Sequence, residues 1–298
     1  MALKINVERA RNVGRLLSAA WNAGGVLGDG SMPEDLTPAG VEHGSPEHAL
    51  FLTLTVAIDY MRNADQLWDA ARMTYGDPHT HYLFNPVEVT RTGLGRCQDD
   101  LIRYGVVKKQ MRDTTIWTTI CLTLCRHFGG RVEPLLAEAE WSGPKIIALI
   151  RSEKYRDGFP NLKGPKIAPL WVRMLKDNWQ GHELVDMDKV ELPVDVHTGA
   201  ATVMTGCVGG SFRGRFSEFA EAVWQVWREG CERTELYPLQ LDEPLWHLSR
   251  GGCRKTVTMP CEYESMCPVA IFCTGTRLSA YGKLGQLPNE VSFETGVW

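Results

Sequence analysis

The chain has 298 residues, of which 44% are hydrophobic and 23% are charged. This composition is ordinary for a folded globular protein and argues against intrinsic disorder, and the length allows one large core or two lobes. The formal net charge of −4 argues against a protein that coats nucleic acid through its overall charge, although a local basic face remains compatible with it.

The N-terminal segment MALKINVERARNVGRLL carries charged residues where a signal peptide has an unbroken apolar core. No window of the sequence reaches the roughly 18 apolar residues that a membrane span needs. We therefore expect a cytoplasmic protein with no membrane partner. Because that compartment is reducing, a dense group of cysteines is expected to bind a metal or cofactor rather than to form structural disulfides.

Helical patterns follow one another along the chain, and alternating strand patterns are nearly absent. A largely apolar helix is predicted to begin at Pro46, with Ser45 as its N-cap. Three further helices, each ending at glycine, are predicted for residues 64–76, 95–105 and 113–130. The segment GRFSEFAEAVWQVWREG predicts a helix whose aromatic stripe packs in the core. The predicted architecture is therefore all-α, with mostly short loops.

Two segments stand out as long connections. Residues 24–46 are rich in glycine and proline and are expected to be flexible or lid-like, and residues 177–193 form the second connection.

Cys121 and Cys125 lie in the apolar run IWTTICLTLC, which indicates buried core thiols rather than a functional pair.

A basic segment spans residues 151–176, which contain seven lysines or arginines and only two acidic residues. Most such runs are only a solvated face. Within this one, FPNLKGPKIAPLWVRML places a turn centred on Gly164 before an amphipathic helix. A turn whose amides point outward at a helix N-terminus can bind phosphate, and Lys163 and Lys166 flank this turn. The same pattern is also typical of a purely structural turn between two helices.

The segment ELPVDVHTGAATVMTG places Asp195 after Pro193 and before a helical run. Its carboxylate is compatible with an N-cap that accepts the free amides of the helix, and also with a catalytic group. Periodicity does not separate these two interpretations.

Four cysteines lie within the 21 residues CRKTVTMPCEYESMCPVAIFC, from Cys253 to Cys273. Two disulfides, a zinc site or an iron–sulfur cluster would each explain this density. The loop contains no histidine, and it lacks the two close Cys-x-x-Cys pairs that zinc ribbons prefer.

Three segments follow one another in the chain: LKGPKIA, then PVDVHTGAAT, then a four-cysteine loop preceded by PLWHLSRGGC. In this order they resemble segments of the helix–hairpin–helix DNA glycosylases of the endonuclease III type, which carry a [4Fe–4S] cluster. The resemblance runs from about Ser45 to Cys273. It implies a two-lobed helical fold with a six-helix barrel lobe. The implied parts are an N-terminal extension that packs with the C-terminal lobe (1–44), the six-helix lobe (45–178) with its hairpin at 159–175, and a lobe with the catalytic aspartate and the cluster (179–298).

Three features depart from the family pattern. The hairpin has one matching glycine where the family has two, and Pro165 removes an amide directly after it. The segment 177–190 looks like an insertion between hairpin and aspartate. The cysteines are separated by seven, five and five residues, and only the last gap agrees with the family. The resemblance nevertheless favours a [4Fe–4S] cluster over an all-cysteine zinc site.

The resemblance also implies roles for individual residues. Asp195 corresponds to the catalytic carboxylate, and Lys166 to the amine that forms a Schiff base in members that also cut the strand, with Lys163 as the nearby alternative. The implied DNA-binding residues are Lys163, Gly164, Arg250, Arg254 and Lys255. The implied cluster ligands are Cys253, Cys261, Cys267 and Cys273. The implied base pocket involves Asp59, Tyr60 and Trp117.

The activity implied is excision of a damaged or modified base from double-stranded DNA by a monomeric enzyme, with or without strand cleavage. The unusual segments 24–46 and 177–190 suggest a bulky modified base, including bases carried by phage DNA. Two alternatives stay open: an N-glycosidase acting on a free modified nucleoside or nucleotide, and a non-catalytic DNA-binding relative.

Overall fold

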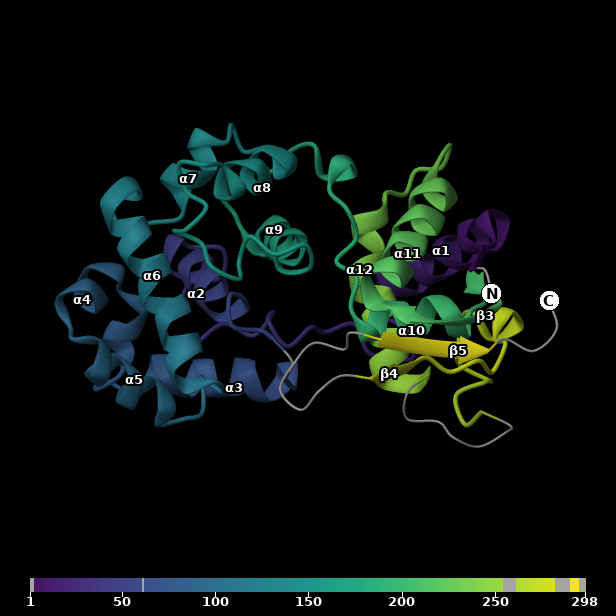
Figure 1. Ribbon diagram of the computed structural model, residues 1–298, viewed down its shortest axis with the longest axis horizontal. Coiled ribbons are helices and arrows are strands. Elements are labelled where there is room, and N and C mark those ends of the chain that lie inside the picture. Colours follow the sequence, from purple (N-terminus) through teal and green to yellow (C-terminus); the bar gives the residue numbers. More distant parts are fainter. Residues whose placement is uncertain (1–2, 61, 254–260, 282–289, 295–298) are drawn as a thin grey trace. The chain divides into compact units, whose positions relative to one another are not determined.

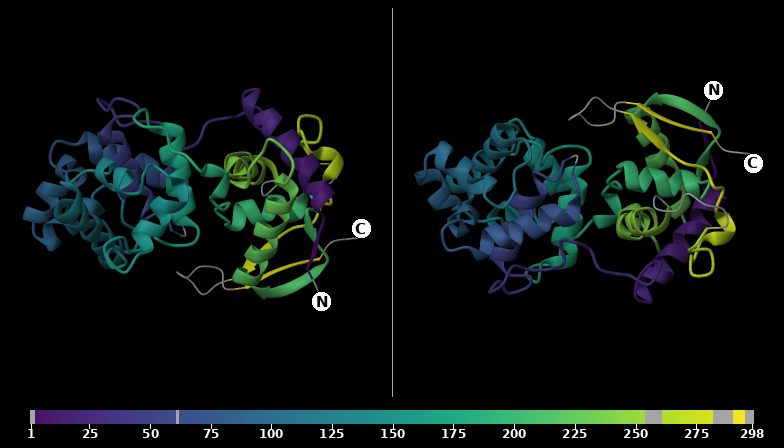
Figure 2. Two further views of the ribbon diagram at one scale, coloured as in Figure 1. Left: turned by 90° about the horizontal axis from the view of Figure 1, so that it is seen from above. Right: turned by 90° about the horizontal axis from the view of Figure 1, so that it is seen from below.

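The structure is a computed structural model that describes residues 3–60, 62–253, 261–281 and 290–294. It is mostly helical, as the sequence predicts (Figure 1). The chain divides into two compact units: unit 1 comprises Met1–Ser31 and Glu191–Trp298, and unit 2 comprises Met32–Val190. Unit 1 therefore contains segments from both ends of the sequence, and Figure 2 shows α1 and the C-terminal strands within it from two sides.

Unit 2 is built from helices. They are α2 (Pro46–Val56), α3 (Ala64–Gly76), the 3-10 helix η1 (His81–Phe84), α4 (Pro86–Arg91), α5 (Leu94–Ile102), α6 (Gln110–Phe128), α7 (Glu133–Glu138), α8 (Gly143–Arg151), α9 (Ile167–Asn178) and the 3-10 helix η2 (Met187–Lys189).

Unit 1 combines helices with short strands. They are β1 (Lys4–Ile5), α1 (Val7–Asn22), α10 (Val196–Met204), β2 (Val208–Gly209), β3 (Ser211–Arg215), α11 (Phe216–Cys231), the 3-10 helix η3 (Pro238–Leu241), α12 (Asp242–His247), the π-helix η4 (Leu248–Cys253), the 3-10 helix η5 (Ala270–Phe272), β4 (Ser279–Tyr281) and β5 (Glu290–Glu294).

The core of unit 2 is centred on α2 and α9. Ser45 caps α2 as predicted, since its side chain accepts a hydrogen bond from the amide of His48. Trp171 of α9 is fully buried and donates its indole N–H to the hydroxyl of Thr53 on α2 at 2.9 Å. Almost every residue of α9 is buried, so this helix is a core element rather than the amphipathic helix that the sequence predicts. No helix in the described parts of the chain is both long and apolar enough to cross a membrane.

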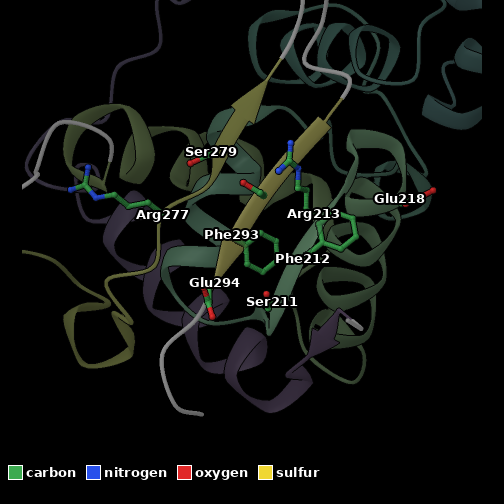
Figure 3. Close-up of a pocket in the computed structure, with 9 residues that line it drawn as sticks. Ser211, Phe212, Arg213, Glu218, Arg277, Ser279, Phe293 and Glu294 are labelled. Atoms are coloured by element: carbon green, nitrogen blue, oxygen red, sulfur yellow. The ribbon is translucent and has the colours of Figure 1, made fainter.

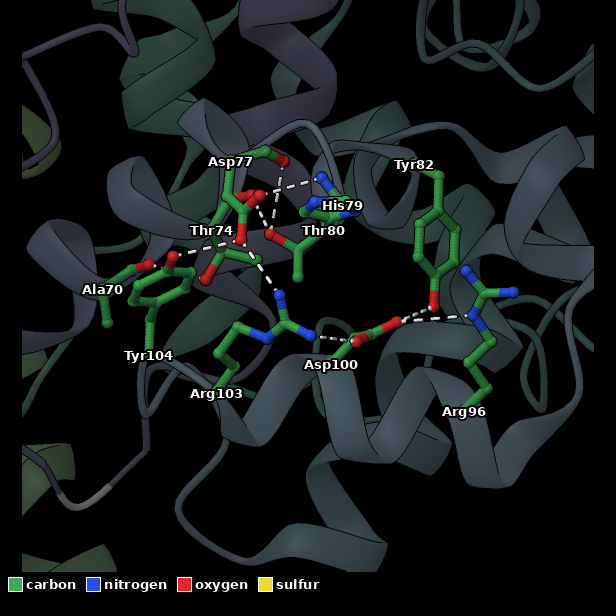
Figure 4. Close-up of polar contacts among 10 residues, drawn as sticks. All are labelled: Ala70, Thr74, Asp77, His79, Thr80, Tyr82, Arg96, Asp100, Arg103 and Tyr104. Atoms are coloured by element: carbon green, nitrogen blue, oxygen red, sulfur yellow. Dashed lines mark hydrogen bonds and ion pairs between the residues drawn. The ribbon is translucent and has the colours of Figure 1, made fainter.

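A network of charged and phenolic side chains joins α3, η1 and α5 (Figure 4). Asp100 accepts a hydrogen bond from the hydroxyl of Tyr82 at 2.8 Å and pairs with Arg103 at 3.4 Å. Arg103 also reaches Asp77 at 3.2 Å, which accepts a hydrogen bond from the hydroxyl of Tyr104. Burial and the bond to Asp100 raise the pKa of Tyr82 well above its ordinary value. Because these side chains use one another as hydrogen-bond and ion-pair partners, we interpret the network as structural.

The beginning of unit 2 is anchored, although the sequence suggests a flexible or lid-like connection over 24–46. Glu34 is buried, and its carboxylate lies 2.5 Å from the guanidinium of Arg173 on α9. Arg72 of α3 donates to the backbone carbonyls of Pro33 and Leu36. These contacts hold the segment from Met32 onward against the helices of its own unit.

The segment that looks like an insertion, 177–190, folds back onto the start of α8. Asp186 accepts a hydrogen bond from the hydroxyl of Ser142 at 2.7 Å, directly before α8. Trp141 stacks on Trp179 and on His182, with ring centroids 6.2 and 4.8 Å apart. The segment is therefore packed against unit 2 rather than extended away from it.

The core of unit 1 is formed by α1, α10 and α11. The predicted aromatic stripe of α11 packs inward, and the indole N–H of its Trp227 donates to the hydroxyl of Thr202 on α10 at 2.9 Å. Trp224 donates in the same way to the carbonyl of Leu192 at 2.7 Å. The stripe is thus packing, as the sequence indicates, and not a binding surface.

Two small antiparallel sheets in unit 1 are absent from the all-α prediction. β1 pairs with β2, and a second sheet has the order β3-β5-β4. Phe212 of β3 lies opposite Phe293 of β5, and Phe293 packs edge-on against Phe219 of α11. A pocket of about 680 Å³ adjoins this sheet (Figure 3). None of the site residues that the sequence predicts lines it; its lining residues are Ser211, Phe212, Arg213, Glu218, Arg277, Ser279, Ser292, Phe293 and Glu294.

Candidate functional site

The first part of the basic segment, residues 152–166, forms a long turn between α8 and α9. Arg151 at the end of α8 holds the turn by donating to the carbonyls of Lys163 and Gly164, at 2.9 and 3.2 Å. The amide of Gly164 donates to the carbonyl of Asn161 at 2.9 Å, and Pro165 has no amide to offer. Because the Gly164 amide is engaged inside the turn, phosphate binding here would depend mainly on side chains.

Lys166 lies directly before α9, beside a carboxylate. Its Nζ is 3.9 Å from Oδ2 of Asp59, which follows α2, and both side chains are partly buried. Asn161 of the same turn donates its side-chain amide to the carbonyl of Ala57. The basic turn and the end of α2 are therefore joined, and two of the residues that the sequence predicts, Asp59 and Lys166, are brought together.

The other candidate amine, Lys163, has a different environment. Its Nζ donates to the backbone carbonyl of Arg156 within the turn. An amine held by a backbone carbonyl supports the turn, whereas Lys166 faces an ionisable partner. The geometry therefore favours Lys166 over Lys163 as a chemically active amine.

Tyr60, next to Asp59, contacts two cations that the sequence reasoning missed. Nζ of Lys109 and Cζ of Arg112 are each 4.5 Å from the centroid of the Tyr60 ring. Burial acts to raise the pKa of Tyr60, but the hydrogen bond from Arg112 and the charge of Lys109 outweigh it, and the pKa is lowered. The basic run KKQMR, at the beginning of α6, is the sequence signal that could have drawn attention to these residues.

Trp117, predicted as a wall of the base pocket, is fully buried. Its indole N–H donates to the carbonyl of Leu83 at 2.8 Å, and its ring meets Phe84 edge-on at 5.1 Å. In this structure Trp117 contributes to the core of unit 2, with its one donor satisfied.

Asp195 is the N-cap of α10. One of its carboxylate oxygens, Oδ1, accepts hydrogen bonds from the amides of His197 and Thr198, at 2.8 and 3.0 Å. The imidazole of His197 lies 5.7 Å from the ring of Trp246, and its Nδ1 is 3.4 Å from the hydroxyl of Ser249. The aspartate is thus held in a fixed orientation at the beginning of the helix, and it is partly buried there.

The four-cysteine loop is fastened to the same helix. Thr274, directly after Cys273, donates its amide and hydroxyl to the carbonyl of Met204, the last residue of α10. At its other end, Cys253 is the last residue of the π-helix η4, which packs against α10. Cys253 and Cys267 pack against the core of unit 1.

The four sulfurs influence one another electrostatically. Burial, together with the neighbouring thiols Cys267, Cys273 and Cys261, raises the pKa of Cys253 to about 12. Burial likewise raises the pKa of Cys267. Their donor chemistry fits an iron–sulfur cluster. Among the residues that the structure describes, however, no group of three or more Cys, His, Asp or Glu side chains is arranged to hold a metal ion.

The candidate residues fall into two groups, each within one unit. Unit 2 holds Asp59, Tyr60 and Lys166 together, with the turn residues Lys163 and Gly164. Unit 1 holds Asp195, the four cysteines and Arg250, which lies in η4. Arg254 and Lys255, predicted to contact DNA, lie outside the described residues.

No protein-family model matches this chain, and no curated protein is significantly similar to it.

Proposed function

We propose that the chain is a DNA glycosylase of the helix–hairpin–helix type, which flips a modified base out of double-stranded DNA and cleaves its N-glycosidic bond. Asp195 is the catalytic carboxylate of this proposal. The four-cysteine loop holds a [4Fe–4S] cluster, with zinc as the alternative. The protein acts as a cytoplasmic monomer.

The observation that carries the proposal is that α10 joins the four-cysteine loop to Asp195. Two backbone amides fix its carboxylate at the beginning of a largely buried helix, and the four-cysteine loop is fastened to the end of that same helix. Lys166, in unit 2, also supports the proposal, because a partly buried amine beside the carboxylate of Asp59 provides a nucleophile together with a group that can move a proton.

In this mechanism the sugar acquires oxocarbenium character as its bond to the base breaks. A carboxylate near C1′ stabilises the developing positive charge and can orient the attacking water. Asp195 is suited to this task because its carboxylate supplies negative charge from a position that two backbone amides fix. The amides also restrict its rotation, so the carboxylate is oriented before the substrate arrives.

The test is abasic-site formation on a panel of duplexes that carry uracil, oxidised, alkylated or hypermodified phage bases. We expect one class of DNA to gain abasic sites, and we expect duplex affinity to fall steeply with salt, because phosphate contacts release counterions. Salt-insensitive, weak binding would instead favour an enzyme acting on free nucleosides. Tight, salt-sensitive binding without excision on any DNA would favour a non-catalytic DNA-binding protein.

If the enzyme also cuts the strand, Lys166 is expected to form the Schiff base. Borohydride should then trap a covalent protein–DNA complex with wild type, and the Lys166→Gln variant should give none. Lys163→Gln is the matched control, because it removes the same charge from the same turn and is expected to keep the trapped complex. Trapping that persists in Lys166→Gln and disappears in Lys163→Gln would reverse the assignment.

The cluster has its own test. Protein purified without oxygen is expected to absorb broadly in the visible range and to contain about four iron atoms per chain. Cys267→Ser should lower the iron content strongly, whereas Cys125→Ser, on α6 of unit 2, should leave it unchanged. Colourless protein with about one zinc ion per chain would establish the zinc alternative.

A further inference from the structure

Two positive charges gather around the partly buried ring of Tyr60 in unit 2. Lys109 and Arg112 lie against the Tyr60 ring at 4.5 Å each, and the side chain of Arg112 is exposed. Both come from the N-terminal turn of the 19-residue helix α6. Cations at this end of a helix are repelled by its dipole, so helix stability does not explain their presence.

The backbone that carries the two cations is held rigidly. Asp113 is buried, and its carboxylate accepts the amides of Lys108 and Lys109, both at 2.8 Å. Arg62 donates to the carbonyls of Gly105 and Val106, just before this turn. A binding group that is fixed in advance loses less entropy when its ligand arrives.

Two further polar groups lie close to Tyr60 in the sequence. Nε of Arg62 is buried and has no hydrogen-bond partner among the described residues, and buried donors are normally satisfied. Asp59, the residue before Tyr60, is the carboxylate that lies 3.9 Å from Lys166. The residue that contacts the two cations is therefore the chain neighbour of the residue that lies beside the proposed nucleophile.

We infer that Tyr60, Lys109 and Arg112 bind an anionic oxygen group of the DNA strand, next to the nucleotide that is excised. The inference rests on the proposed function for the identity of the ligand. The anionic group is either a backbone phosphate or an acidic substituent on the target base, since guanidinium and ammonium groups recognise both.

The experiment measures duplex affinity by fluorescence anisotropy over a series of salt concentrations. The duplexes carry either cytosine or 5-carboxycytosine at one position, and the variants are Lys109→Gln, Arg112→Gln and Tyr60→Phe. Lys145→Gln is the charge-matched control, because Lys145 lies on α8 and pairs with Glu140 at the surface. Thermal unfolding of each variant verifies that it is folded.

With phosphate as the ligand, Lys109→Gln and Arg112→Gln should each weaken binding to both duplexes and lower the salt slope by about one. With an acidic base as the ligand, the loss should be confined to the 5-carboxycytosine duplex. Tyr60→Phe keeps the ring and should retain most of the affinity, and Lys145→Gln should match wild type. Folded variants that bind both duplexes as wild type does would overturn the inference.

These results separate the inference from the proposed function. If wild type binds duplex with a steep salt slope and the variants do the same, the inference fails while the proposed function stands. If wild type has no salt-dependent affinity for duplex, the proposed function fails. In that case inorganic pyrophosphate tests the anion site independently of DNA. If pyrophosphate raises the melting temperature of wild type but not that of Arg112→Gln, the anion site is supported. If it does not raise the melting temperature of wild type, the anion site is overturned.

Discussion

Replacing Arg173 by methionine is expected to lower the free energy of unfolding of unit 2 by about 3–5 kcal/mol, because it leaves a buried carboxylate without its partner. The side chains of Arg173 and Glu34 are only 4% and 3% exposed, and their closest atoms are 2.5 Å apart. Arg173 also approaches Asp177 at 3.7 Å. The pair joins the first residues of unit 2 to α9, so its loss should release that segment from the helix.

The loss of stability arises because one charge of the pair stays buried without its partner. A double variant, Arg173→Met with Glu34→Leu, replaces both charges by apolar groups and is expected to recover most of the lost stability. Lys145→Gln breaks the exposed pair with Glu140, whose side chains are 53% and 73% exposed, and should cost less than about 1 kcal/mol.

Urea denaturation followed by circular dichroism gives the three free energies. Hydrogen exchange of α9 amides assigns the loss to unit 2, because two compact units can unfold in separate transitions. If Arg173→Met costs no more than Lys145→Gln, the buried pair does not anchor the segment.

This pair also shows where sequence reasoning reaches its limit. An acidic residue in a Gly/Pro-rich stretch is normally exposed, so residues 24–46 look flexible in the sequence. The partner that buries Glu34 lies 139 residues further along the chain. No local pattern contains that information.

Helices were predicted well where their signals are local. The helix 64–76 has the bounds of α3, and Gly129, with φ of 61°, ends α6 as the glycine rule predicts. The beginning of α6 was placed three residues too late, because Asp113 caps the amides of Lys108 and Lys109 from inside the helix.

The strands were missed for a different reason. β1 and β2 have two residues each, too few for an alternating pattern, and β3 contains a glycine. The partner of β3 is β5, about eighty residues later, where Ser211 lies opposite Glu294. Short strands with distant partners leave almost no periodic signal.

The candidate site was predicted in part. Asp59, Tyr60 and Lys166 were singled out by the resemblance, and the structure brings Asp59 and Lys166 within 3.9 Å. Lys109 and Arg112 were missed because Tyr60, the ring they contact, is far from them in the sequence. Both interpretations of Asp195 predict an aspartate at the beginning of α10, so its position there does not distinguish a cap from a catalyst.

The Asp195→Asn variant separates those two interpretations. Asparagine caps a helix about as well as aspartate, so this change should leave the stability of unit 1 within about 0.5 kcal/mol of wild type. It removes the negative charge that the mechanism places beside the sugar. The rate of abasic-site formation should therefore fall by about 10²–10³-fold, as with other groups that stabilise charge in a transition state.

Asp195→Ala is the companion variant, because it removes the charge and the cap together. It should lose activity to the same extent and, in addition, about 1 kcal/mol of stability. Single-turnover abasic-site formation and urea denaturation, measured on both variants, give the rate and the stability independently. If Asn retains wild-type activity while Ala loses both, Asp195 acts only as a helix cap and the catalytic carboxylate lies elsewhere. If Asn is stable but inactive, the charge itself is required, and the carboxylate that opens α10 serves the chemistry as well as the helix.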